Sequence, residues 1–283
     1  MNTPSGDGSP SNDGSVTGAD RIVAHAKLTI GLRITGVRPD GYHLIDAEMV
    51  TLALADTLTI SPIDEPHGSD RLATEPNNRP NNRLTVSGAY ATGVPLDSDN
   101  LVARALDLTG RLARVHLDKQ IPHGGGLGGG SADAAAILRW AGWTPTPDLL
   151  VAAAGIGADV AFCLAGGRAR VRGIGESVTA LAHLDRTVTL VIPPLRVSTP
   201  AAYRRWDELG GPIAAGPNDL EPAAISLEPE LARWRDRIGE ATGRTPVLAG
   251  SGATWFVHGR HDRALDHLTR SGAQVLVTHT VPA

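Results

Sequence analysis

Apolar and polar residues alternate along residues 22–35, which read IVAHAKLTIGLRIT. The apolar set falls on one face of an extended chain: Ile22, Ala24, Ala26, Leu28, Ile30, Leu32 and Ile34. The polar set falls on the other face: His25, Lys27, Thr29, Arg33 and Thr35. This period of two residues predicts a half-buried β-strand, with Lys27 and Thr29 on the face away from the core.

A turn follows the first predicted strand. Residues 37–43, VRPDGYH, contain the Asp-Gly pair that is typical of tight turns. A second strand is expected within residues 48–60, EMVTLALADTLTI, and a short one within residues 84–89, LTVSGA. The intervening residues 64–83, which contain PNNR twice, are expected to form a loop.

Helical spacing begins near residue 101. Four apolar residues between 101 and 112 share one helical face, and Ser98 or Asp99 can cap this helix. Three elements are expected after it: a strand at 113–121, a helix at 132–142 capped by Ser131, and a short helix around 148–155.

From residue 182 the order of elements changes. The pattern predicts a strand at 187–195, a helix from Thr199-Pro200 through Arg205, a helix at 229–241, two strands around a glycine turn at 246–259, a helix at 261–272 and a strand at 273–281. Helices mixed with hairpins in this way indicate an α+β half. We therefore expect a disordered tail at 1–20, one domain at 21–181 and a second domain at 182–283.

Composition excludes several classes of protein. The 283 residues carry a net charge of −4, which gives no general attraction to nucleic acid or an anionic membrane. The tail lacks the features of a signal peptide, and no apolar run is long enough to span a bilayer. Cys163 is the single cysteine, which fits a cytoplasmic location. Of 26 basic residues only Lys27 and Lys119 are lysine, a weak indication that a compact ammonium is wanted there.

Six glycines lie within the stretch QIPHGGGLGGGSADAAA, residues 120–136. A predicted strand enters this stretch and a predicted helix leaves it. Backbone N–H groups without neighbouring side chains can converge on an anion there, at the positive end of the helix. The stretch therefore predicts a phosphate-binding loop.

Other glycine patterns fit this loop less well. The Walker A pattern fails because Gly130, and not lysine, precedes Ser131. The dinucleotide pattern is met by Gly124, Gly126 and Gly129, but the strand that should open such a domain is missing. A flexible linker is the remaining alternative, and the flanking Ile-Pro pair and the patterned helix argue against it.

The loop closely resembles the phosphate loop of the GHMP kinases. Its doubled form, GGGLGGGSADAA, resembles the branch of that family whose acceptor is 4-diphosphocytidyl-2-C-methyl-D-erythritol. The segment AHAKLTIGLRITGVRPDGYH is similar to the N-terminal signature of that branch. The segments SDNLVARAL, GADVAF, GGRARVRGIGE, NDLE and LAGSGAT follow in the order of the family. The resemblance runs from about residue 22 to about residue 252.

This resemblance implies a two-domain GHMP kinase fold of the α+β class. The N-terminal domain would be an α/β nucleotide-binding domain with further strands in a mixed sheet, and the C-terminal domain would be ferredoxin-like. It also implies transfer of the γ-phosphoryl group of ATP to the 2-hydroxyl of that acceptor, with ATP and Mg²⁺ as cofactors, in non-mevalonate isoprenoid synthesis. No nucleic-acid or membrane partner is implied.

The resemblance also assigns roles to single residues. Asp159 corresponds to the catalytic base, and Lys27 to the lysine that pairs with it and contacts the reacting oxygen. Tyr42 and His43 fall at positions that contact cytidine, and Thr29 falls beside the acceptor. ATP would contact Asn100 and a phosphate loop that consists of Pro122, His123, Gly124, Gly125, Gly126, Leu127, Gly128, Gly129, Gly130, Ser131 and Ala132.

Each of these residues also has a purely structural interpretation. Asp159 could cap a helix, and Lys27 could be a solvated lysine on a strand. Asn100 and Ser131 could cap the helices that follow them. The aromatic pair of the DGYH turn could simply pack that turn.

Three positions depart from the family pattern. Thr29 stands where the family has asparagine, while Ala161 and His25 stand where it has proline. These departures concern the choice of acceptor more than the transfer of phosphate. Two alternatives therefore stay open: a GHMP kinase for another small alcohol, and a non-catalytic ATP-binding protein of the same fold.

Overall fold

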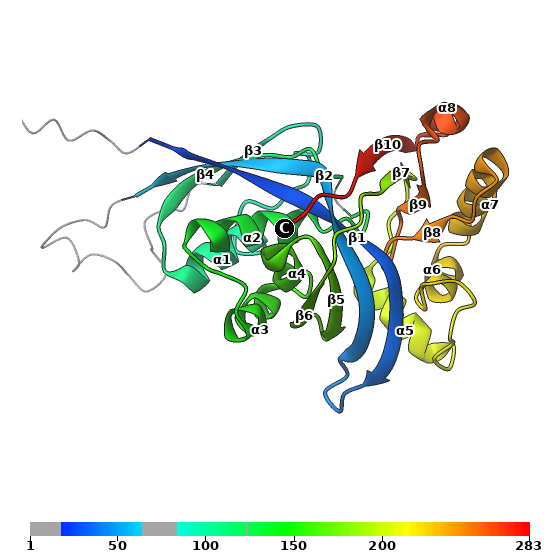
Figure 1. The fold of residues 1–283 in the computed structure, drawn as a ribbon, viewed down its shortest axis with the longest axis horizontal. Coiled ribbons are helices and arrows are strands. Elements are labelled where there is room, and N and C mark those ends of the chain that lie inside the picture. The colour runs from blue at the N-terminus through cyan, green and yellow to red at the C-terminus, as the bar shows by residue number, and fades with distance from the viewer. Residues whose placement is uncertain (1–17, 64–83, 123) are drawn as a thin grey trace, which may run out of the picture.

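A computed structural model describes residues 18–63, 84–122 and 124–283. Two long antiparallel strands, β1 (Asp20–Val37) and β2 (His43–Pro62), form a hairpin that crosses the molecule (Figure 1). The predicted turn joins them, and the N–H of Arg38 donates to the carbonyl of Tyr42 at 2.8 Å. Both strands and the turn are confirmed. The predicted loop at 64–83 and residues 1–17 of the predicted tail lie outside the described residues.

The hairpin belongs to a mixed sheet with the order β3-β4-β2-β5-β6, in which β1 pairs with β2. The other strands are β3 (Leu84–Ser87), β4 (Ala113–Asp118), β5 (Arg168–Gly173) and β6 (Ser177–Leu181). The pair β3–β4 is parallel and the remaining pairs are antiparallel. This arrangement agrees with the expected mixed sheet.

Four helices accompany this sheet: α1 (Leu101–Thr109), α2 (Gly129–Trp140), α3 (Pro147–Ile156) and α4 (Val160–Ala165). Helix α2 is buried without interruption from Ala132 to Leu138, because its alanines let β1, β2, α1 and α4 approach it closely. Two predicted caps are wrong. Asn100, and not Ser98 or Asp99, caps α1. Helix α2 starts after Gly128, so Ser131 lies inside its first turn.

The C-terminal half contains a second sheet with the order β10-β7-β9-β8. Its strands are β7 (Thr187–Ile192), β8 (Val247–Leu248), β9 (Trp255–His258) and β10 (Gln274–His279), and every pair is antiparallel. The helices are α5 (Thr199–Glu208), α6 (Glu221–Leu227), α7 (Glu230–Thr242) and α8 (Asp262–Leu265), which a 3₁₀ helix (Asp266–Ser271) continues. This β-α-β-β-α-β order is ferredoxin-like, as expected.

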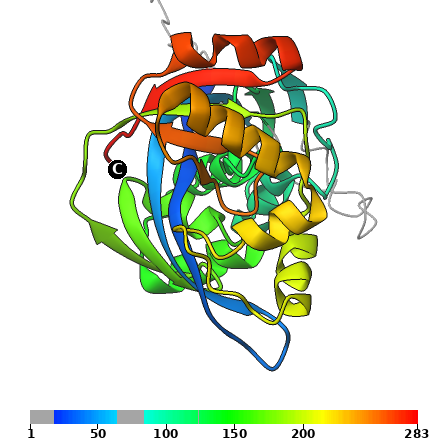
Figure 2. The ribbon, with the colours of Figure 1, turned by 90° about the vertical axis from the view of Figure 1, so that its right-hand side faces the viewer.

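Helices α6, α7 and α8 lie on the outer side of the second sheet (Figure 2). Helix α6 was not predicted, and α5 begins at Thr199 as expected but continues to Glu208 instead of ending at Arg205. Two isolated bridges, Leu32 with Asn218 and Leu52 with Thr280, join the hairpin to the C-terminal half. The boundary near residue 181 stays a prediction. Over the part of the chain that the structure describes, no helix is long and apolar enough to cross a membrane.

The central part of β1 is buried on both faces, which corrects the prediction of a half-buried strand. Lys27 is 4% exposed and Thr29 is 2% exposed, although both belong to the polar face. A register shift between His25 and Lys27 interrupts the pairing of β1 with β2 at this point. Chain segments that are distant in sequence cover this polar face, and they belong to the candidate site.

Candidate active site

An ion pair between Lys27 and Asp159 lies at the centre of the candidate site. Nζ of Lys27 lies 3.1 Å from Oδ2 of Asp159 and donates to Oγ1 of Thr29, also at 3.1 Å. Asp159 is the residue before α4, but its side chain makes no capping hydrogen bond. The Asp159 side chain is 31% exposed, so its carboxylate is open to a bound substrate. The capping interpretation of Asp159 and the solvated interpretation of Lys27 are both wrong.

The glycine loop packs directly against the Lys27 side chain. The N–H of Lys27 donates to the carbonyl of Leu127 at 3.0 Å. A Cβ on Gly128, whose φ is +67°, would lie 2.6 Å from Cγ of Lys27. Glycine tolerates both this left-handed backbone and this close approach. Helix α2 starts at the next residue without a side-chain cap, which leaves its first N–H groups available to an anion.

The LAGSGAT turn of the C-terminal half supports the glycine loop. A Cβ on Gly126 would lie 2.5 Å from the carbonyl oxygen of Ala249, so the two backbones meet directly. Asn218 holds the turn in place, because its Nδ2 donates to the carbonyls of Leu248 and Gly250 at 2.9 and 2.7 Å. Asn218 is buried, and no sequence pattern predicts an individual role for it, because its partners lie about 30 residues away along the chain.

A buried charge cluster, here called the Lys119 cluster, lies next to the loop and consists of Lys119, Asp56 and Asp133. Nζ of Lys119 donates to Oδ2 of Asp133 at 2.7 Å and to Oδ2 of Asp56. Burial raises the pKa of Asp133 to about 7, against the opposing effect of the Lys119 charge. The rarity of lysine was the one signal in the sequence for this cluster, because the partners lie 63 and 14 residues from Lys119.

Aromatic side chains gather where the DGYH turn meets α5. Nε2 of His43 lies 2.8 Å from Oδ1 of Asp207. The His43 ring lies 4.7 Å from the ring of Tyr203 and 5.7 Å from that of Trp206, between ring centroids. Tyr203 and Trp206 are three residues apart on α5, so they share the helix face that meets His43. This three-residue spacing of aromatic residues is visible in the sequence and predicts a shared aromatic face.

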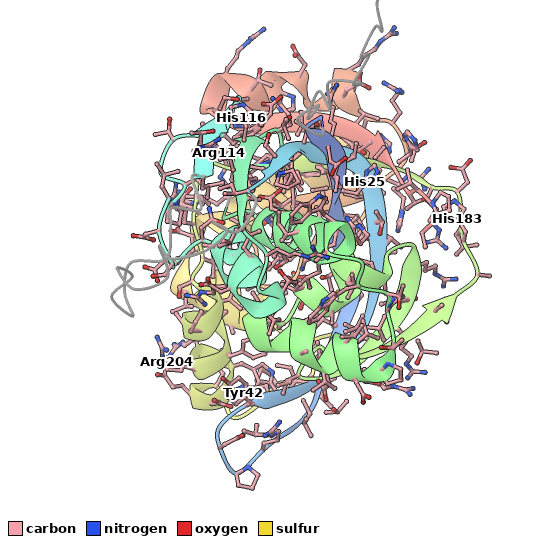
Figure 3. All side chains as sticks on the ribbon, turned by 90° about the vertical axis from the view of Figure 1, so that its left-hand side faces the viewer. His25, Tyr42, Arg114, His116, His183 and Arg204 are labelled. Carbon is pink, nitrogen blue, oxygen red and sulfur yellow. The ribbon has the colours of Figure 1, made fainter. Side chains whose placement is uncertain are left out.

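Tyr203 links the aromatic group to the ion pair. Burial, and then the negative charge of Asp159, raise the pKa of Tyr203. Tyr42, in contrast, is 59% exposed, and the Arg38 guanidinium lies 5.8 Å from its ring centroid. Figure 3 shows Tyr42 at the end of the hairpin, on the same side of the molecule as Arg204 of α5.

The remaining predicted site residues have mixed outcomes. The side chain of Asn100 accepts from the N–H of Val102 at 2.9 Å and donates to the carbonyl of Pro95 at 2.7 Å, so it is a helix cap. Its contact with adenosine stays a prediction. Ser131 lies in the first turn of α2, beside the loop. His123 lies outside the described residues.

The three departures from the family pattern are accommodated without disorder. Thr29 keeps a hydrogen bond to Lys27, as noted above. Ala161 is buried in the first turn of α4, which forms without the family proline. Nδ1 of His25 lies 3.0 Å from the carbonyl of Leu52, so this ring ties β1 to β2.

Comparison with known proteins identifies the family. A model of the GHMP kinases N terminal domain matches residues 100–167. The 4-diphosphocytidyl-2-C-methyl-D-erythritol kinase of Paracoccus denitrificans is 37% identical over 256 residues, covering 83% of this chain and 85% of the relative. The kinase of the same name from Rhizobium johnstonii is 38% identical over 264 residues, covering 82% of each chain.

Solved structures agree with this assignment. A crystal structure of 4-(cytidine 5'-diphospho)-2C-methyl-D-erythritol kinase matches with a TM-score of 0.68 and 30% identity, over 93% of this chain and 100% of that one. Homoserine kinase from Cytophaga hutchinsonii matches with a TM-score of 0.58 and 18% identity, over 93% of this chain and 95% of that one, and shows the fold alone. The expected two-sheet α+β GHMP kinase fold is therefore confirmed. The chain belongs to the 4-diphosphocytidyl-2-C-methyl-D-erythritol kinases of the GHMP kinase family, which are phosphotransferases with an alcohol group as acceptor.

Proposed function

We propose that the chain transfers the γ-phosphoryl group of ATP to the 2-hydroxyl of 4-diphosphocytidyl-2-C-methyl-D-erythritol, as a cytoplasmic step of non-mevalonate isoprenoid synthesis. The observation that carries the proposal is the Lys27–Asp159 pair, held against an uncapped helix start by the glycine loop. The relatives that share most of the chain carry the name of this activity. Membership of the GHMP kinases implies the use of ATP.

Asp159 and Lys27 have different roles in activating the acceptor hydroxyl. The acceptor oxygen forms a bond to the γ-phosphorus while the bond from that phosphorus to the β–γ bridging oxygen breaks and ADP leaves. The hydroxyl proton passes to the exposed carboxylate of Asp159, which acts as the general base. Lys27 is buried, and its ammonium fixes the Asp159 carboxylate and offers positive charge to the reacting oxygens. Thr29 orients that ammonium by accepting a hydrogen bond from it.

The glycine loop and the start of α2 would bind the phosphates of ATP. Leu127 and Pro122 are buried and anchor the loop. The glycines between them have no side chains that could obstruct the backbone N–H groups. Gly126 and Gly128 have positive φ values of +78° and +67°, a left-handed backbone that glycine adopts readily. A side chain at either position would fill space that the LAGSGAT turn or Lys27 already occupies.

Mg²⁺ fits this site as a companion of ATP rather than as an ion held by protein ligands alone. Among the described residues no group of three or more His, Cys, Asp or Glu side chains could hold a metal. Asp159 and Asp133, which flank the loop, are each paired with a lysine. Mg²⁺ in proteins is usually held by one or two carboxylates together with the phosphates of its substrate, so the use of Mg²⁺ would not require such a cluster. When bound, it would neutralise charge on the transferring phosphoryl group.

The aromatic group on α5 would take the cytidine end of the acceptor. His43 is fixed by Asp207, which leaves its ring with a defined edge and face for a base. Tyr203 adds a second aromatic face close to the ion pair. Exposed Tyr42 can close over a base from the hairpin side.

The test is a panel of acceptors with the purified full chain, ATP and Mg²⁺. Release of ADP and formation of a phosphorylated product are followed with 4-diphosphocytidyl-2-C-methyl-D-erythritol, homoserine and mevalonate. We expect product with the cytidine-linked acceptor alone. Turnover with another alcohol instead would support the kinase activity and contradict the proposed acceptor. Binding of ATP without transfer to any alcohol would favour the non-catalytic alternative.

A further inference from the structure

The two lysines of the chain lie against two consecutive glycines of the phosphate loop. A Cβ on Gly128 would lie 2.6 Å from Cγ of Lys27, and a Cβ on Gly129 would lie 3.1 Å from Nζ of Lys119. All 24 other basic residues are arginines. Each lysine therefore lies where the loop passes directly over a buried ammonium, which is more compact than the guanidinium of arginine.

The Lys119 cluster connects the two ends of this loop. At the leading end, Oδ1 of Asp56 accepts from the N–H groups of Gln120 and Ile121 at 2.5 and 2.8 Å. At the trailing end, Asp133 lies in the first turns of α2 and accepts from Lys119 at 2.7 Å. The ammonium that joins these carboxylates thus fixes residues 120 and 133 with respect to each other, with the whole loop between them.

Backbone hydrogen bonds and the mixed sheet hold the anchor of this connection. The N–H of Lys119 donates to the carbonyl of Ser87 at 2.8 Å, and its carbonyl accepts from the N–H of Tyr90 at 3.1 Å. Asp56 lies on β2, a central strand of the mixed sheet. A loop rich in glycine has a large backbone entropy, so converging its N–H groups on one point requires ends that do not move.

The cluster is poorly explained as a stabilising element alone. It buries two carboxylates against one ammonium, and Oδ1 of Asp133 has no hydrogen-bond partner among the described residues. Apolar residues of similar size at such positions are often as stable as a buried ion group or more stable. Its geometric effect on the loop is therefore the feature that distinguishes it from an apolar packing.

We propose that Lys119, Asp56 and Asp133 form a positioning device for the phosphate loop, in which Lys119 holds the start of α2 at the place where its N–H groups meet the phosphates of ATP. Lys119 is a positioning residue and does not touch the reacting atoms. The proposal rests on the loop being the ATP site. It assigns the second lysine of the chain a role in nucleotide affinity that is separate from the acceptor chemistry of Lys27 and Asp159.

The test uses Asp133→Ala, because this change frees α2 while the Lys119–Asp56 pair keeps its balance of charge. Asp133→Asn serves as the conservative variant, since the amide oxygen can still accept from Lys119. Asp148→Ala is the matched control, because Asp148 is an exposed acid in the first turn of α3, away from the loop. The dissociation constant of ATP with Mg²⁺ is measured by calorimetry, and hydrogen exchange is measured for the amides of the loop.

We expect ATP to bind Asp133→Ala about tenfold more weakly, with faster exchange at residues 124–131 and an unchanged KM for the acceptor. Asp133→Asn should remain within about threefold of the wild type, and Asp148→Ala within about twofold. Equal ATP affinity and equal loop exchange in Asp133→Ala and the wild type would overturn the proposal. Failure of the wild type to bind ATP would instead overturn the proposed function on which it rests.

Discussion

Replacing Gly128 by alanine tests how closely the phosphate loop and the catalytic lysine depend on each other. The new Cβ would lie 2.6 Å from Cγ of Lys27 and 3.1 Å from its Cε. Carbon atoms are normally about 3.5–4.0 Å apart, so the lysine stem or the loop must move by roughly 1 Å. Alanine also has to adopt the left-handed backbone of Gly128, which costs about 1–2 kcal/mol.

Gly124→Ala is the matched control for the backbone effect. Gly124 has a φ of +78°, but a Cβ there would meet nothing within 4 Å. The two variants therefore share the backbone penalty, and Gly128→Ala adds an overpacking penalty of about 1–3 kcal/mol. The free energy of unfolding is measured by urea titration of each variant. The difference between them isolates the contact of the loop with Lys27.

Activity should separate the two variants more strongly than stability does. A shift of about 1 Å in the Lys27 ammonium disturbs its 3.1 Å contact with Asp159, and such misplacement can lower kcat about 100-fold. Gly124→Ala should mainly weaken ATP binding, because its effect stays within the loop. Steady-state kinetics with ATP as the varied substrate give kcat and the KM of ATP for each variant. Equal kcat and equal unfolding free energy in the two variants would refute the proposed contact.

Three further predictions concern the surroundings of the site. Asp207→Ala removes the partner of His43 and should raise the KM of the acceptor about 3–10-fold while the KM of ATP stays the same, as measured by steady-state kinetics. Asn218→Ala leaves two carbonyls of the LAGSGAT region without their donor and should lower the free energy of unfolding by about 1–3 kcal/mol in urea titration, whereas a loss below about 0.5 kcal/mol would contradict its role. The pKa of Asp133 is about 7 in the folded chain and 3.8 unfolded, so its contribution to stability is complete below about pH 4 and is lost as the pH rises through 7. Asp133→Asn should therefore flatten the fall in stability over this window, which can reach about 1.4 kcal/mol per pH unit, and an unchanged slope would contradict the raised pKa.

The sequence predicted local structure well where one periodicity dominates. The strand around Lys27, the turn of the DGYH motif and the strands on either side of the LAGSGAT turn all follow from spacing and turn residues. The start of α2 was misplaced, because a left-handed Gly128 can begin a helix without any side-chain cap. Helix α6 was missed because its seven residues give too little periodicity.

The parts of the site that could not be predicted depend on contacts between distant segments. Lys27 was placed on a solvated face because alternation shows only that two faces differ, and not that a loop a hundred residues later covers the polar one. The Lys119 cluster draws on β2, the end of β4 and α2, and its charges become close only when the sheet and helix pack. Tyr203 likewise acquires its role through His43 and Asp159, from the other half of the chain.

The central claim is that Asp159 takes the acceptor proton during transfer from ATP. Single-turnover transfer from radiolabelled ATP to 4-diphosphocytidyl-2-C-methyl-D-erythritol, in the wild type and in Asp159→Asn, tests it most directly. The amide keeps the size of the side chain and a contact to Lys27 but cannot act as the base, so we expect the transfer rate to fall about 100- to 10,000-fold with ATP affinity unchanged. A transfer rate in Asp159→Asn within about threefold of the wild type would contradict the account.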